Sequence, residues 1–291
     1  MKKVHTPVLL NQSLDGLNIQ SDGFYIDGTL GDAGHSYEIL KKLSPKGLLL
    51  SIDQDKDAIE FVKKSFKKDE RWKIVHGNFA KIDILAGKYQ RKPDGILLDI
   101  GMSSRQIEES RRGFSYRAAN EELDMRMDET LSVTAKDLLK VLTADELTLL
   151  FRKYGEERFA KKIANTIKES DEINTVGDLT GLIQGVVPAA QAHQKDPSRR
   201  VFQALRIAVN DELFNLKLSL EKSFEILNNT GRLCVISFHS LEDRIVKKFF
   251  KEKEVAEKAK IITKKPIVAT EVEIKENPRA RSAKFRVLEK N

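Results

Sequence analysis

The sequence predicts an α/β fold in which a Rossmann-like, doubly wound parallel sheet is interrupted by an inserted helical domain. Short apolar runs alternate with amphipathic stretches between residues 23 and 100, which is the pattern of βαβ units. Roughly the next hundred residues have helical periodicity and no convincing strand, and a β pattern returns at residue 232. Both ends of the chain are therefore expected to build the same sheet.

The first part of the chain should supply four strands and two helices. The two helical stretches place apolar residues at steps of three and four, so that one face of each helix is apolar. Apolar runs mark the expected strands at 24–27, 48–53, 72–77 and 95–100, and the helices are expected at 35–43 and 56–66.

The middle of the chain is expected to be helical. Thr143 and Thr175 stand where a helix N-cap is expected, and Gly155 stands where a helix should stop. Helices are therefore predicted at 143–155, 156–170 and 175–187.

The last part of the chain returns to the sheet. A long amphipathic stretch covers 199–229, and an apolar run at 232–238 is typical of a buried strand. A charged helix at 241–260 and a final strand at 283–290 should follow. The expected domains are 1–104 and 200–291, the two parts of the sheet domain, and the helical insertion 105–199.

Composition restricts the class of protein. With 40% hydrophobic residues, the 291-residue chain can bury a sizeable core, and its single cysteine, Cys234, excludes a disulfide framework or a cysteine-based zinc cluster. No apolar run approaches the ~20 residues that cross a bilayer, and no secretory signal opens the chain, so we expect a cytoplasmic protein without a membrane partner. The 51 Lys and Arg against 44 Asp and Glu give a net charge of +7, which favours a polyanionic partner such as nucleic acid.

A glycine-rich turn follows the first expected strand. The strand ends in Asp27, and Gly28, Gly31 and Gly34 lead into the next helix. Glycines let the backbone turn sharply and approach a ligand at the carboxyl edge of a sheet. The spacing G-x-x-G-x-x-G departs from the dinucleotide fingerprint, which weakens a pyrophosphate interpretation and leaves a turn without a ligand as the alternative.

Asp53 favours a ligand. It closes the second expected strand about 20 residues after the glycines, where an acidic side chain can accept hydrogen bonds from both hydroxyls of a ribose. Its alternative role is to cap the helix that follows Gln54. The combination indicates an adenosine-bearing ligand.

Asp99 ends the fourth expected strand, so Asp27, Asp53 and Asp99 should gather at one edge of the sheet. Three carboxylates favour a cationic ligand, and S-adenosylmethionine, with its sulfonium and ammonium groups, fits better than a nicotinamide dinucleotide with two phosphates. A metal is the competitor, but the region lacks a His and carboxylate at ligand spacing, so none is predicted.

The segment 235–249 runs from a strand through a polar turn into a helix. Ser240 is expected to cap that helix, with Glu242 and Asp243 in its first turn. The functional alternative places His239 beside the carboxyl end of the strand, where it could touch a substrate base or position a water.

A basic cluster lies near the C-terminus. Its four cations are closely spaced, as in phosphate-binding segments, although a solvated basic tail is nearly as compatible with the pattern. The cluster comprises Arg279, Arg281, Lys284 and Arg286.

Taken together, these motifs closely resemble the MraW family of bacterial small-subunit ribosomal RNA cytosine-N4 methyltransferases. Long and unusual segments such as LDMRMD (123–128), FHSLEDR (238–244) and NPRARSA (277–283) carry the resemblance. The departures are mild, since Ile100, Met102 and Phe285 stand where the family often has other apolar residues. Further matching segments occur in order along the chain at 5–10, 27–36, 51–55, 97–108, 111–116, 154–158, 199–213 and 236–249.

The resemblance implies a class I methyltransferase fold, S-adenosylmethionine as donor, and methylation of the exocyclic N4 of a cytidine in the decoding centre of 16S rRNA. It implies that assembled small ribosomal subunits are the substrate, and it leaves a homodimer open. The donor site carried over from the family comprises Ala33, Gly34, His35, Asp53, Phe79, Asp99 and Gln106, to which we add Asp27.

The catalytic groups are an inference from chemistry. A cytosine amino group is a poor nucleophile, so the enzyme must orient it and accept a proton. Many amino-methyltransferases use an (Asp/Asn/Ser)-Pro-Pro-(Tyr/Phe) motif for this, and here the chain has Asp99-Ile-Gly-Met-Ser-Ser instead. We expect Asp99, Ser103, Ser104 and His239 to take its place.

The expected environment of Cys234 distinguishes N4 methylation from C5 methylation. Transfer to carbon 5 ordinarily needs a cysteine thiolate, and Cys234 lies in an apolar strand that should bury it. The rival from another class is a non-catalytic RNA-binding or ribosome-assembly factor on the same fold. A degenerate glycine turn or a lost acidic residue would favour that rival, and both features are intact.

Overall fold

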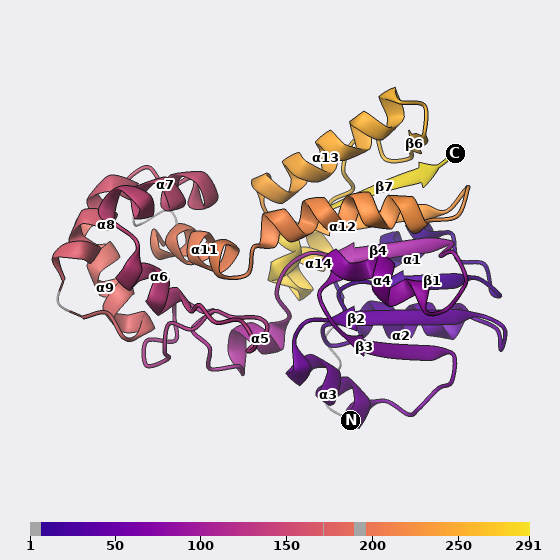
Figure 1. The fold of residues 1–291 in the computed structure, drawn as a ribbon, viewed down its shortest axis with the longest axis horizontal. Helices are drawn as coiled ribbons and strands as arrows, with labels where there is room; N and C mark the ends of the chain where they lie inside the picture. Colours follow the sequence, from indigo (N-terminus) through magenta and orange to yellow (C-terminus); the bar gives the residue numbers. More distant parts are fainter. Residues whose placement is uncertain (1–6, 171, 189–195) are drawn as a thin grey trace. The chain divides into compact units, whose positions relative to one another are not determined.

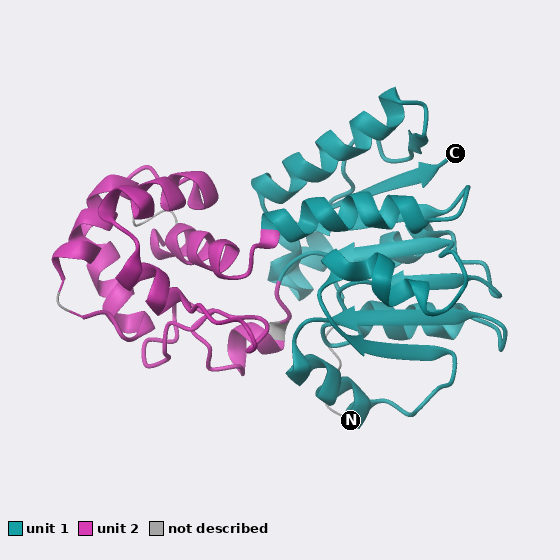
Figure 2. Ribbon diagram, in the orientation of Figure 1, with its two compact units in different colours: residues 1–101, 213–291 teal, residues 102–212 magenta. Residues whose placement is uncertain are grey.

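The computed structural model describes residues 7–170, 172–188 and 196–291, except for the side chain of Ser104. The chain divides into two compact units, which Figure 2 shows in different colours. Unit 1 is formed by Met1–Gly101 together with Leu213–Asn291, and unit 2 by Met102–Glu212. Among the described residues, no helix is long and apolar enough to cross a membrane.

Unit 1 contains a seven-stranded sheet of order β3-β2-β1-β4-β5-β7-β6 (Figure 1). Pairing is parallel from β3 to β5, whereas β7 is antiparallel to both of its neighbours. Strand order reverses at the β1/β4 boundary, which is the switch point where ligands bind in open α/β sheets. The strands are β1 (Phe24–Asp27), β2 (Leu48–Asp53), β3 (Trp72–His76), β4 (Gly95–Asp99), β5 (Arg232–Ser237), β6 (Ala259–Ile261) and β7 (Lys284–Lys290).

Helices cover both faces of this sheet. One face packs on α1, α2 and α3, and the other on α4, α12 and α13. The helices of unit 1 are α1 (Leu10–Leu17), α2 (Gly34–Lys42), α3 (Lys56–Ser65), α4 (Ile82–Gly87), α12 (Glu212–Ile226, which begins at the last residue of unit 2), α13 (Ser240–Val255) and α14 (Glu271–Glu276), with 3-10 turns η1 (Phe79–Lys81) and η2 (Pro278–Ser282).

Alternate residues of each strand enter opposite cores. In β1, Tyr25 packs toward α1 and α2, whereas Phe24 and Ile26 pack toward α4 and α12. Both faces are buried because the side-chain period of a strand is two and helices flank the sheet on both sides. The near-continuous apolar runs of the sequence follow from this arrangement.

Unit 2 is helical and has its own core. Thr143 and Thr175 cap α7 and α9 as predicted, and each cap is completed by an acidic residue three positions later, Glu146 and Asp178 respectively. Buried side chains such as Phe151 fill the core. The helices are α5 (Ser104–Glu108), α6 (Ala135–Val141), α7 (Ala144–Gly155), α8 (Ala160–Glu169), α9 (Val176–Val186) and α11 (Ser198–Val209).

The boundary of the helical unit lies further along the chain than residue 199. The stretch 199–229 is two helices, because the chain breaks after α11 at Asn210 and Asp211 has a left-handed φ of 48°. The Asn210 side chain stabilises the break by accepting a hydrogen bond from the Met127 amide at 2.7 Å and donating one to the Met125 carbonyl at 2.8 Å. The buried face of α11 belongs to the core of unit 2, so the unit extends to Glu212.

A short strand, β6, replaces the end of the expected helix 241–260. Helix α13 stops at Val255, and Glu257 follows with a left-handed φ of 57°. The chain then pairs antiparallel with β7. Because β6 has only three residues, its sequence pattern cannot be distinguished from the end of a charged helix.

Candidate functional site

Three acidic residues end neighbouring strands of unit 1. The strands β2, β1 and β4 are adjacent, and Asp27 of β1 pairs in register with Ser51 of β2 and Leu97 of β4. Asp53 and Asp99 each lie two residues beyond those partners. The prediction that the three carboxylates gather at the carboxyl edge is therefore confirmed by the sheet topology.

Asp27 is held inside the turn. Its side chain is almost completely buried, and Oδ1 accepts hydrogen bonds from the Thr29 amide at 3.1 Å and hydroxyl at 3.3 Å. Oδ2 accepts from Ser36 Oγ at 2.6 Å, and that hydroxyl lies 2.7 Å from Ser51 Oγ. Because these donors come from the turn and from α2, Asp27 joins the glycine-rich turn to the start of α2, and Ser36 extends the contact to β2.

The glycine-rich turn needs glycine for two reasons, which are the lack of space for a side chain and a left-handed backbone. A Cβ on Gly28 would lie 2.5 Å from Leu98 Cδ2, and Gly31 has a left-handed φ of 50°. Ala33, the residue before α2, is also left-handed with φ 66° and is fully buried. Gly34 then begins α2, and a Cβ there would lie 2.9 Å from Pro7 Cγ. The backbone therefore passes the sheet edge with little side-chain cover.

Asp53 ties the second strand to this turn. Its Oδ2 accepts a hydrogen bond from the Gly31 amide at 2.8 Å, and Oδ1 accepts one from the Asp55 amide at 2.9 Å. Burial raises the pKa of Asp53 to about 6 despite these bonds, with Asp55 and Asp27 adding to the rise. Each oxygen keeps acceptor capacity for a further donor.

The alternative role of Asp53 as a helix cap is wrong. The N-cap of α3 is Asp55, whose side chain accepts a hydrogen bond from the Asp57 amide. Asp53 therefore remains available to a ligand.

Phe79 lies just beyond the same edge. It opens η1 after β3 and is partly buried against the core on the α4 side of the sheet. A Cβ on Gly28 would lie 3.4 Å from Phe79 Cβ, so the ring belongs to the neighbourhood of the glycine-rich turn. Reasoning from the residues alone missed it, because a single aromatic after a strand is an ordinary core signal.

Asp99 is paired with a histidine. His35 Nδ1 lies 3.5 Å from Asp99 Oδ2, and His35 Nε2 lies 3.1 Å from the Val8 carbonyl oxygen. The sequence has no His and carboxylate at ligand spacing in this region, but the fold pairs His35 of α2 with Asp99 of β4, which are 64 positions apart.

The environment of Asp99 disfavours its charge. Within the described residues, the buried oxygen Oδ1 has no hydrogen-bond partner. Burial raises the pKa of Asp99 to about 6, and the opposing effect of His35 is smaller. Its backbone is fixed, since the Asp99 amide donates to Thr29 Oγ1 at 2.7 Å. A carboxylate of this kind is a better proton acceptor than an exposed one.

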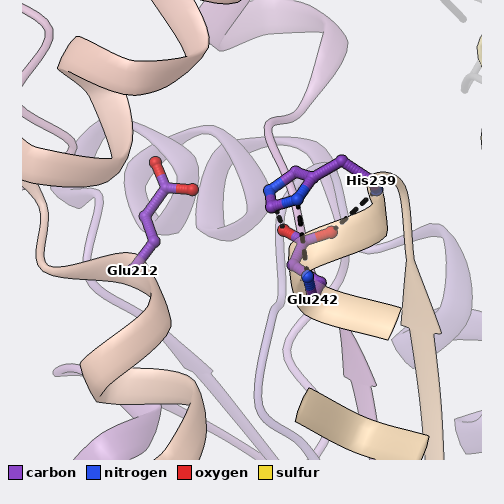
Figure 3. A group of neighbouring side chains, drawn as sticks. All are labelled: Glu212, His239 and Glu242. Carbon is purple, nitrogen blue, oxygen red and sulfur yellow. Dashed lines mark hydrogen bonds and ion pairs between the residues drawn. The ribbon is translucent and has the colours of Figure 1, made fainter. Parts of the chain in front are cut away.

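His239, rather than Ser240, is the N-cap of α13. Its Nδ1 accepts a hydrogen bond from the Glu242 amide at 3.4 Å, and Glu242 Oε2 accepts from the amides of Phe238 and His239. Figure 3 shows the imidazole facing the Glu242 carboxylate, with Nε2 and Oε1 3.0 Å apart. Glu242 and Asp243 lie in the first turn as predicted.

Glu212 is drawn with this pair in Figure 3, but its carboxylate is already neutralised. Both oxygens accept hydrogen bonds from Arg206, at 2.7 and 2.9 Å. We assign no metal to Glu212, His239 or Glu242.

Ser103 and Gln106 belong to unit 2 and form a capping box on α5. The Gln106 amide donates to Ser103 Oγ at 3.1 Å, and the Ser103 amide donates to Gln106 Oε1 at 3.0 Å. The side chain of Ser104 lies outside the described residues. The roles predicted for these three residues remain predictions.

The basic C-terminal cluster is divided by the fold. Arg286 is buried, and its Nε donates to Asp243 Oδ1 at 2.7 Å, while Lys284 Nζ donates to Asp243 Oδ2 at 3.1 Å. Arg286 is therefore not the phosphate contact that we expected, because Asp243 neutralises its charge inside unit 1. Arg281 is exposed in η2, and Arg279 is partly exposed there.

Cys234 is buried in the middle of β5, as predicted. Burial raises the pKa of its thiol far above the ordinary value. The thiolate that a covalent mechanism needs is therefore strongly disfavoured.

The sheet order, the antiparallel β7 and the glycine-rich turn between acidic strand ends define a class I methyltransferase. Sequence comparison places it more narrowly. The pattern of the MraW methylase family matches residues 2–291, so the chain belongs to that family and is a methyltransferase that uses S-adenosylmethionine.

Similar proteins cover nearly the whole chain. One from Caldicellulosiruptor saccharolyticus is 47% identical, over 98% of this chain and 99% of its own length. Others from Halothermothrix orenii and Clostridioides difficile are 46% and 45% identical, each over 98% of both chains. All three are named ribosomal RNA small subunit methyltransferase H.

Proposed function

We propose that this protein transfers a methyl group from S-adenosylmethionine to N4 of a cytidine in the decoding centre of 16S rRNA, with the assembled small ribosomal subunit as substrate. The single observation that carries the proposal is full-length similarity to proteins named ribosomal RNA small subunit methyltransferase H. The choice of N4 rests on the family resemblance and on the chemistry of unit 1.

The donor site is assigned from the geometry of the carboxyl edge. Asp53 binds the ribose hydroxyls through acceptor capacity left by Gly31 and Asp55. The backbone at Ala33, Gly34 and His35 lies beside the donor, and Phe79 contacts the adenine. The negative charges of Asp53 and Asp99 favour the sulfonium and ammonium groups. Asp27 acts indirectly, since its oxygens are occupied within the turn.

For this reaction the protein must position the two reactants and supply a proton acceptor. The lone pair of the cytosine amine attacks the methyl carbon while the S–CH3 bond breaks, and the bond electrons remain on sulfur. The amine, now carrying an extra proton, must lose it. We assign this proton to Asp99, whose pKa is raised to about 6 by burial. Holding the two reactants in line supplies much of the remaining acceleration.

His239 is assigned to the base rather than to the donor. It ends the loop after β5, and Glu242 fixes the ring, because the Glu242 amide donates to Nδ1 and Nε2 lies 3.0 Å from Glu242 Oε1. The target cytidine must leave its stack to reach any such group.

Recognition of RNA is divided between charge and shape. Residues 102–212 carry 17 Lys and Arg against 19 Asp and Glu, so the positive charge of the chain belongs to unit 1, which has 34 against 25. We therefore assign long-range attraction of the polyanion to unit 1. The helical unit is assigned to recognition of ribosome shape, with Val141 and Leu149 as exposed apolar side chains.

The test is methylation of small subunits from a strain that lacks this protein. Purified protein and S-adenosylmethionine should produce N4-methylcytidine at one position, detected by mass spectrometry of digested 16S rRNA. Free 16S rRNA and the Asp53→Ala variant are the controls, and both should give much less product. Formation of 5-methylcytidine, or of no methylated nucleoside, would refute the proposal.

A further inference from the structure

We propose that His35 and Asp99 form a dyad that accepts the proton released by the substrate amine, with His35 as a positioning residue that acts through Asp99. This inference rests on the proposed function and deepens it. The resemblance places His35 only in the donor site, and neither the family nor the relatives' names assign its imidazole a role in proton transfer.

The first step is the tautomer of His35. The Val8 carbonyl can only accept a hydrogen bond, so His35 Nε2, 3.1 Å away, must carry a hydrogen. In the neutral ring Nδ1 is then a lone-pair acceptor. Nδ1 lies 3.5 Å from Asp99 Oδ2, which is longer than an ordinary hydrogen bond, and a proton gained by the pair can bind between these two atoms.

The second step is the support of the imidazole. The side chain of His35 is only 6% exposed, so the ring has little freedom. Val8 belongs to the segment that precedes α1, and the next residue, Leu9, donates its amide to Glu273 Oε1 of α14 at 2.6 Å. Leu9 is fully buried with a left-handed φ of 52°. The N-terminal segment is thus anchored and holds the ring in register with Asp99.

The charged groups around the pair favour a bound proton. Asp27 and Glu242 both raise the pKa of Asp99, and His35 lowers it. Asp27 belongs to β1 and Glu242 to α13, and His35 lies on α2, so three packed elements face the carboxyl. Two negative neighbours favour the state in which the dyad has gained one positive charge.

The proton balance follows. When the N4–CH3 bond forms and the S–CH3 bond breaks, the proton leaves N4 for the Asp99 carboxylate. Oδ2 shares that proton with His35 Nδ1, which produces either a neutral acid beside imidazole or a carboxylate beside imidazolium. The proton returns to solvent after product release.

The test uses His35→Gln, which keeps a donor near the Val8 carbonyl but removes the group that faces Asp99. We expect kcat to fall about 10- to 100-fold, because misplacing a catalytic group costs this much. The dissociation constant of S-adenosylmethionine at pH 8 should stay within about threefold of the wild type. The acidic limb of the kcat profile should move to higher pH, because the group that lowers the pKa of Asp99 is gone. His35→Asn, whose amide replaces Nδ1, should recover part of kcat.

The control is a double-mutant cycle. In an Asp99→Asn background, His35→Gln should cost little further activity, since both residues act through one carboxylate. An effect of His35→Gln that adds in full to that of Asp99→Asn would overturn the dyad. So would a folded His35→Gln enzyme with wild-type kcat and an unmoved acidic limb.

A readout without activity separates this inference from the proposed function. Nitrogen NMR of His35 should show hydrogen on Nε2 at high pH, and the carboxyl carbon of Asp99 should titrate near pH 6 and at higher pH in His35→Gln. If these signals are found but no N4-methylcytidine forms, the proposed function fails, and only the electrostatic coupling of His35 and Asp99 stands. If the Asp99 titration ignores the His35 substitution, the dyad fails whatever the product.

Discussion

Replacing Asp53 by alanine tests the donor site most directly. In the proposed donor site, the substitution removes an ionised acceptor from two ribose hydroxyls, and each such hydrogen bond to a charged group contributes about 1.5 to 3 kcal/mol. It also removes the acceptor that holds the amides of Gly31 and Asp55 at 2.8 and 2.9 Å. We expect S-adenosylmethionine to bind at least about tenfold more weakly, since 1.4 kcal/mol corresponds to a factor of ten.

The pH dependence of binding gives a sharper form of the same test. Burial raises the pKa of Asp53 and that of Asp99 to about 6, so both carboxyls gain a proton as the pH falls through that value. In the proposed site, donor binding needs the ionised forms of both carboxyls. Affinity should therefore be constant above pH 7 and fall about tenfold per titrating group at pH 5. The wild type should respond as two groups, and Asp53→Ala as one.

Isothermal calorimetry between pH 5 and 8 measures both effects. The Asp53→Ala protein must first show the wild-type circular dichroism spectrum and thermal transition. An unchanged affinity in the folded variant would refute the ribose assignment. A wild-type affinity that does not change between pH 5 and 8 would contradict the buried, protonatable carboxyls.

Four further outcomes are expected. Asp243→Ala leaves Arg286 buried without its anion and should lower the free energy of unfolding by about 3 kcal/mol, measured by urea denaturation. Burial alone would raise the pKa of Asp243, but Arg286 and Lys284 together outweigh it and lower that pKa. The contribution of Asp243 should therefore persist at neutral pH and be lost only as the pH falls below about 4. Cys234→Ala should keep most methylation activity, and RNA with 5-fluorocytidine should form no covalent adduct; an adduct at Cys234 would overturn N4 transfer. Arg281→Ala should weaken RNA binding and reduce the salt slope of log affinity by about 0.7 to 0.9, whereas an unchanged slope would make Arg281 a solvated side chain. A variant in which a short linker replaces residues 110–212, so that Ser103, Ser104 and Gln106 are kept, should, if folded, still bind S-adenosylmethionine but no longer methylate small subunits. Retained methylation would exclude a recognition role for the deleted part of unit 2.

Local patterns in the sequence determined much of the fold. The apolar runs predicted β1 and β2 to the residue, and Thr143 and Thr175 are the N-caps that their positions indicated. Hydrophobic periodicity and helix capping depend on residues close together in the chain, so both can be recognised in the sequence without a structure. The gathering of Asp53 and Asp99 was also predictable, because each ends a strand and parallel strands present their carboxyl ends at one edge.

Only the tertiary structure decided which side chains meet. His35 pairs with Asp99, 64 positions away, and Arg286 pairs with Asp243, 43 positions away. No spacing in the sequence predicts either pair. The same holds for the boundary of unit 2 at Glu212, which depends on the core into which α11 is packed. The sequence of a basic segment does not show whether a given cation faces solvent or an internal carboxylate. The packing of distant elements, and not the neighbours in the chain, determines its burial and its partner.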